Sequence, residues 1–72
     1  MRFPDRHKVE EVRQVYPPGT RIELVQMDDV HAPPVGTIGI VQGVDSTGSL
    51  LVAWSNGSSL NVVCGVDIVR RV

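Results

Sequence analysis

From Gly19 onward, turn-forming residues divide the chain into short runs rich in β-branched and aliphatic side chains. All five prolines lie at or before position 34, and six of the seven glycines lie at or after position 36. Runs of this length are typical of strands, and they are too short for the usual helix of a globular protein. They occupy residues 20–27, 36–44, 48–55 and 68–72. The spacing therefore predicts a β-fold of short strands joined by tight turns.

Asn56-Gly57 is the strongest local signal in the chain. Asn and Gly tolerate the positive φ angles that both central positions of a type I′ turn require, so residues 49–55 and 58–63 are expected to form an antiparallel hairpin. This adds a fifth strand. Five short strands fit a small barrel better than a sandwich, which usually needs more strands. We predict a mainly β fold, a five-stranded SH3-like barrel over residues 17–72.

The segment before the barrel, residues 1–16, follows a helical pattern. Val9, Val12 and Tyr16 recur at the i, i+3, i+7 spacing of one helical face. Pro17 is expected to end the helix, because the residue before a proline is pushed out of the α region. We therefore predict one N-terminal amphipathic α-helix of about three turns.

Two similar phrases, PPGT at 17–20 and PPVGT at 33–37, each precede a run of strand-forming residues. Proline stiffens the backbone, glycine permits a tight turn, and threonine opens the strand. Every residue of the two phrases thus has a structural reason to be present. We interpret both phrases as strand-entry turns rather than as binding loops.

Charge and cysteine content exclude several classes of protein. Seven basic and eight acidic residues leave a formal net charge of −1, which supplies no general attraction for a nucleic acid or an anionic membrane. The single cysteine, Cys64, cannot form an internal disulfide, and residues 1–12 lack the apolar region of a secretory signal. No apolar run approaches the roughly 20 residues of a membrane helix. These features predict a soluble, cytoplasmic protein without a membrane partner.

The strongest candidates for chemistry lie in one loop, where Asp28, Asp29 and His31 stand together. Their side chains could bind a metal ion, with His7 or Cys64 completing the ligand set. Zinc sites are typically built from closely spaced ligand pairs such as Cys-x-x-Cys, and this sequence has no such pair. We favour a structural interpretation, in which one aspartate caps the loop through its backbone amides.

Nucleophilic catalysis finds equally little support in the sequence. No serine stands in a G-x-S-x-G elbow, and the run GVDSTGS lacks the lysine of a phosphate-binding loop. We therefore predict a non-enzymatic protein with no catalytic residue, no bound metal, no cofactor and no small-molecule substrate.

Between Gly36 and Val66 the only formally charged side chain is Asp45, and the strands there are apolar on both faces. One face carries Val41, Leu50, Val52 and Trp54, which we assign to the core. The other face carries Ile38, Ile40, Leu51 and Ala53. A barrel has only one inside, and soluble monomers rarely leave a large apolar patch uncovered. We predict that this second set is a partner surface, covered by the N-terminal helix, by a second copy of the chain or by a foreign protein.

Arg21, Arg70 and Arg71 form the candidate nucleic-acid edge. Residues 17–72 also contain five acidic side chains, which makes a dominant basic patch improbable. Nucleic acid is therefore the less favoured partner.

From Tyr16 to the end, the series YPPGTRIELVQM, APPVGTIGIVQGVDSTG, VAWSNGSSL and GVD resembles an uncharacterised bacterial and phage family, the domain of unknown function numbered 4314. The resemblance implies an SH3-like fold that is often encoded on mobile elements, and it implies no activity. The chain departs from the family pattern at Ser55, where an acid is expected. Our working hypothesis is an interaction module that mediates protein contacts, and the alternative is a nucleic-acid-associated accessory protein of a phage or other mobile element.

Overall fold

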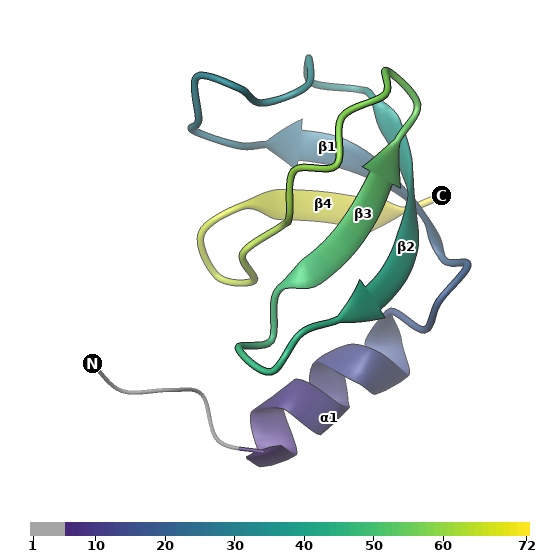
Figure 1. The fold of residues 1–72 in the computed structure, drawn as a ribbon, viewed down its shortest axis with the longest axis vertical. Coiled ribbons are helices and arrows are strands. Elements are labelled where there is room, and N and C mark those ends of the chain that lie inside the picture. Colours follow the sequence, from purple (N-terminus) through teal and green to yellow (C-terminus); the bar gives the residue numbers. More distant parts are fainter. Residues whose placement is uncertain (1–5) are drawn as a thin grey trace.

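A computed structural model describes residues 6–72 and consists of one helix and a single antiparallel sheet (Figure 1). The elements are α1 (Arg6–Val15), β1 (Arg21–Gln26), β2 (Ile38–Val44), β3 (Leu50–Trp54) and β4 (Ile68–Arg71). The strand order across the sheet is β3-β2-β1-β4, with every neighbouring pair antiparallel. The predicted helix and four of the predicted strands are confirmed. The five-stranded SH3-like barrel is wrong, because the described residues form an open sheet of four strands.

The missing strand is the predicted one at residues 58–63. Its far end does pair with β3, since Leu50 and Val62 exchange two backbone hydrogen bonds of 2.8 and 3.0 Å. Nearer the turn, the carbonyl of Leu60 accepts a hydrogen bond of 2.8 Å from the indole Nε1 of Trp54. A side-chain donor therefore takes the place of a backbone ladder contact. The segment keeps one isolated bridge to β3 instead of becoming a strand.

The turn after β3 lies at the predicted position, but its type differs from the prediction. Gly57 has a φ of 90°, whereas no non-glycine residue in the described part of the chain has a positive φ, so Asn56 cannot supply the second positive angle of a type I′ turn. The backbone N–H of Gly57 donates to the carbonyl of Trp54 at 3.0 Å, and the N–H of Trp54 donates to Ser58 at 2.9 Å. This is a three-residue loop that ends in a left-handed glycine.

The two proline phrases form two separate turns of the same type, each of which leads into a strand. This confirms their interpretation as strand-entry turns. Thr20 donates to the carbonyl of Pro17 through its backbone N–H at 3.1 Å and through Oγ1 at 2.6 Å. Thr37 makes the same two bonds to Pro34, at 3.0 and 2.6 Å. The glycine before each threonine has a φ of 93°, as the third position of a type II turn requires. Both turns thus have a structural role in the β1–β2 pair.

The core lies on one face of the sheet and is made of aliphatic side chains gathered around one indole. Its buried members are Ile22, Leu24, Val41, Leu50, Val52, Trp54 and Val62, which confirms the four residues assigned to the core from the sequence. Gly39 is buried beneath the indole. A Cβ at this glycine would lie 2.6 Å from Cγ1 of Val52 and 2.7 Å from Cε3 of Trp54. The absence of a side chain at Gly39 therefore allows the indole to pack directly on β2.

Helix α1 completes the core, and it does not cover the predicted partner surface. It lies at the end of the sheet where β2 stops and β3 starts (Figure 1). Val9 is buried, and Val12 and Tyr16 pack against the core cluster. The expectation that the helix covers the apolar partner surface is therefore wrong. Residues 1–5 of the predicted helical segment lie outside the described residues.

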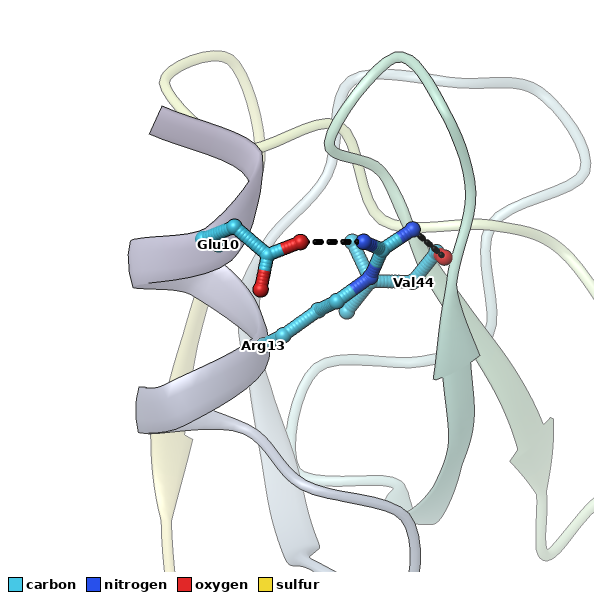
Figure 2. A network of polar contacts seen from close by, with 3 residues as sticks. All are labelled: Glu10, Arg13 and Val44. Atoms are coloured by element: carbon cyan, nitrogen blue, oxygen red, sulfur yellow. Dashed lines mark hydrogen bonds and ion pairs between the residues drawn. The ribbon is translucent and has the colours of Figure 1, made fainter. Parts of the chain in front are cut away.

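Arg13 connects the helix to the sheet (Figure 2). Nη1 of Arg13 lies 2.7 Å from Oε1 of Glu10 on the same helix, and Nη2 donates to the carbonyl of Val44 on β2 at 3.5 Å. The first contact orients the guanidinium toward the sheet, and the second reaches the last residue of β2.

Candidate protein-binding surface

The outer face of the sheet, opposite the core, carries the predicted partner surface. Alternation along β2 and β3 directs Ile38, Ile40, Leu51 and Ala53 away from the core, and the strand register places Ile40 opposite Ala53. Ile40 and Leu51 are each 37% exposed, Ala53 is exposed and Ile38 is half-buried. We call these four residues the outer patch. The structure brings all four together, as the sequence predicted.

Charged side chains of β1 and β4 border the outer patch on one side. In the β1–β2 register, Arg21 lies opposite Ile40 and Glu23 lies opposite Ile38. Glu23 also lies opposite Arg70 on β4, and the two side chains form a bidentate pair, with Nε to Oε2 at 3.2 Å and Nη2 to Oε1 at 3.1 Å. This hydrogen-bonded carboxylate raises the pKa of the Arg70 guanidinium. The charge of Arg70 is therefore already matched within the chain.

Arg21 differs from Arg70 in its surroundings. Its side chain is exposed on the same face, beside Ile40. The salt bridges found within residues 6–72 do not include Arg21. The outer patch thus borders a guanidinium that is available to a carboxylate of another molecule.

Arg71 does not join the other two arginines. It lies opposite Ile22 in the β1–β4 register, which places it on the core face of the sheet. Its Nη1 donates to the carbonyl of Val15 at the end of α1, at 3.4 Å. A cation near the last carbonyls of a helix stabilises the helix end. The predicted nucleic-acid edge is therefore divided between two faces of the sheet.

The loop of residues 27–36 is organised by one aspartate. Oδ1 of Asp29 accepts from the backbone N–H of His31 at 2.7 Å, and the carbonyl of Asp29 accepts from Ala32 at 3.0 Å. This confirms the predicted capping role. In the described part of the chain, no group of three or more His, Cys, Asp or Glu side chains is placed to hold a metal ion, so Asp28, Asp29 and His31 do not assemble such a site with His7 or Cys64.

Cys64 lies at an isolated bridge with Asp67, in the segment that leads to β4. Its side chain is exposed, although partial desolvation raises the pKa of the thiol above its usual value. The thiol is therefore mostly protonated at neutral pH, which makes it a poor nucleophile.

A groove that the sequence did not predict lies between the loop at residues 27–31 and the segment at residues 58–67. Its volume is about 680 Å³. A smaller groove of about 510 Å³ lies between α1 and the segment at residues 62–69. The segment that joins β3 to β4 contributes to the lining of both grooves (Figure 1).

The sequence model of one family, described as Domain of unknown function (DUF4314), matches residues 5–72. The chain belongs to this family. No curated protein and no solved structure matches it. The outer patch, its arginine border and both grooves therefore lie within the part of the chain that defines a DUF4314 domain. Within residues 6–72, the helix α1 is neither long nor apolar enough to cross a membrane.

The sequence missed the larger groove because its two walls are far apart in the DUF4314 chain. The loop contributes Asp28 and Asp29, and the segment before β4 contributes Asp67. One signal in the sequence could have indicated the groove. The region from Gly36 to Val66 has a single charged side chain, whereas Asp28 and Asp29 precede this region and Asp67 follows it. Only the pairing of β1 with β4 showed that the loop after β1 lies beside the segment before β4.

Proposed function

We propose that this DUF4314 domain is a non-enzymatic binding module that docks a protein on the outer patch. The observation that carries the proposal is an apolar sheet face on which Ile40 and Leu51 remain 37% exposed. Contiguous apolar surface bordered by polar residues is typical of protein interaction sites. A cytoplasmic location belongs to the same proposal.

The charge beside the outer patch indicates what kind of partner fits. Arg21 is available, whereas the carboxylate of Glu23 is engaged by Arg70. A fitting partner presents apolar side chains next to a carboxylate, which would meet Arg21. A second copy of this chain would bring the same patch with the same engaged glutamate, so we favour a foreign protein over self-association.

The alternative is a nucleic-acid-associated accessory protein of a phage or other mobile element. Such a protein needs several cations on one surface. Here Arg70 is paired with Glu23, and Arg71 lies on the other face against α1. These two contacts favour the protein-binding proposal.

The test compares three baits in a lysate of the native host. The wild type and the control Val30→Asp/Val35→Asp, which places the same charges at exposed loop positions, are expected to retain the same protein partner. Ile40→Asp/Leu51→Asp is expected to lose it, because desolvated carboxylates oppose apolar docking. Arg21→Glu should weaken binding of that partner as well. Circular dichroism checks that each bait is folded.

Two outcomes contradict the proposal. One is a partner that binds the patch variant as tightly as the wild type. The other is binding to generic DNA or RNA that falls steeply with salt concentration and is lost in Arg21→Glu, which would support the nucleic-acid alternative.

A further inference from the structure

We propose that the groove between residues 27–31 and 58–67 binds an extended protein segment that carries lysine or arginine next to apolar side chains. We call it the acidic groove. It is a second surface, separate from the outer patch, and the proposal does not depend on what the outer patch binds.

Each wall of the acidic groove contributes apolar side chains among polar ones. Met27 packs against the core from the loop side, and Leu60 is half-buried on the opposite side. Val63 is 45% exposed and Val66 is 70% exposed, both in the segment that forms the second wall. With a volume of about 680 Å³, the groove has room for several side chains of a bound segment.

The charge of the acidic groove has one sign. Asp28, Asp29 and Asp67 line it beside the imidazole of His31, and its lining contains no lysine or arginine. Two of the carboxylates are held by the backbone: Oδ1 of Asp29 accepts from His31 N–H at 2.7 Å, and Oδ2 of Asp67 accepts from Val63 N–H at 2.8 Å. Each of these contacts uses one oxygen and leaves the second for a ligand. The negative charge is therefore held in place before any ligand arrives.

Apolar walls and fixed carboxylates together select the occupant. Lysine and arginine have an aliphatic stem and a charged head, so the stem can lie on the valines while the head meets a carboxylate. A small polyamine would satisfy the charge, but it would cover Val63 and Val66 with less apolar surface than a segment that also carries aliphatic side chains. Both walls lie outside the helix and the four strands, and a concave site of this kind admits an extended segment more readily than a convex globular surface.

The outer patch and the acidic groove differ in the sign of the charge beside their apolar side chains. The outer patch borders the available cation Arg21, whereas the acidic groove contains carboxylates. A basic segment is therefore repelled by the border of the outer patch and attracted by the acidic groove.

The experiment follows backbone amide signals by NMR while a blocked nine-residue peptide of alternating lysine and leucine is added. We expect shifts at Asp28, Asn61 and Val66, with unchanged signals at Ile40 and Leu51. A peptide with glutamine in place of lysine should bind at least about fivefold more weakly. Spermidine should also bind more weakly than the lysine peptide, because its methylene chains bring less apolar surface to Val63 and Val66 than a segment that also carries leucine.

Two variants and a matched control locate the binding. Asp28→Asn/Asp67→Asn should weaken the lysine peptide about fivefold, and the amide introduced at position 67 keeps an oxygen that can accept from Val63. Val63→Ser/Val66→Ser should weaken it by a similar factor. Glu10→Gln/Glu11→Gln changes the net charge by the same amount on α1, outside the acidic groove, and should leave the affinity unchanged.

Several results would overturn the inference. They are shifts confined to the outer patch, no shift at all, equal weakening by the control on α1, or spermidine binding as tightly as the peptide. Should the double aspartate variant fail to fold, Asp28→Asn alone carries the test. Shifts confined to the acidic groove would support this inference whether or not the outer patch binds a protein.

Discussion

The two faces of the sheet are built from the same strands, but one face is buried in the core and the other is partly exposed to solvent. Strands β2 and β3 are apolar on both faces, so apolarity alone does not distinguish the buried face from the exposed one. Strand β1 makes the distinction, because its alternation directs Ile22 and Leu24 to one face and Arg21 and Glu23 to the other. The face that receives the charged residues stays open to solvent. An amphipathic neighbour can thus decide the burial of strands that are apolar throughout.

The largest expected effect is on the core face, at the contact between Gly39 and Trp54. Gly39→Val would place a Cβ 2.7 Å from the indole, and overpacking of this kind should lower the free energy of unfolding by about 3 kcal/mol. Urea unfolding measures the change. Gly43→Ala is the control on the same strand, since its Cβ would meet Leu51 at 3.9 Å. Equal stability of the two variants would mean that the indole does not pack on Gly39.

The next effect concerns the segment that crosses the core face. Trp54→Phe keeps an aromatic ring and removes the indole N–H that donates to the carbonyl of Leu60. We expect a loss of about 2 kcal/mol, from the lost hydrogen bond and the smaller ring. Hydrogen exchange at the amide of Val62 should accelerate more than exchange at Ile22. Uniform acceleration at both amides would show that the indole contact does not hold this segment in place.

A smaller effect on stability is expected from Asp45, in the turn that joins β2 to β3. The side-chain hydrogen bond from Thr47, together with backbone donors of the turn, holds the pKa of Asp45 below its usual value. A carboxyl with a lowered pKa in the folded state stabilises the fold above its unfolded-state pKa. This stabilisation is lost as the pH falls through the folded-state pKa. Urea midpoints should therefore decrease as the pH falls below about 4, the ordinary pKa of an aspartate.

Asp45→Asn tests this assignment. The variant should lose about 1 kcal/mol at neutral pH and show a flatter dependence of stability on pH. Asp28→Asn, at an exposed loop position, serves as the control and should keep the wild-type dependence. An unchanged pH profile in Asp45→Asn would assign the acid sensitivity to other carboxyl groups.

The smallest effect is expected on the outer face. Ile40→Thr/Leu51→Thr should change the free energy of unfolding by less than about 0.5 kcal/mol per site, because both side chains are already partly in water. Threonine also keeps a high strand preference. Thermal unfolding of the double variant measures the difference. A loss as large as that in Gly39→Val would mean that the outer patch stabilises the fold, and it would argue against a surface kept for a partner.

Much of the fold was predictable, because its signals are local. Alternation located the strands, Pro17 marked the end of the helix, and the type II turns follow from the phrases PPGT and PPVGT. The capping aspartate was also predicted, since an Asx side chain bonds to backbone only two residues away. The outer patch followed from alternation combined with the absence of charge.

Other features depended on contacts between distant residues, and the sequence alone did not determine them. The predicted fifth strand is interrupted where the indole of Trp54, packed over Gly39, donates to the carbonyl of Leu60. Arg71 is separated from Arg70 because neighbouring residues of a strand point to opposite faces once the register with β1 is set. The acidic groove exists because the strand order brings two loops together. The sequence by itself determined which short segments form strands and turns, through backbone preferences that act over a few residues. The tertiary structure decided which strand is lost and which charges meet, because these depend on side chains that are neighbours only after folding.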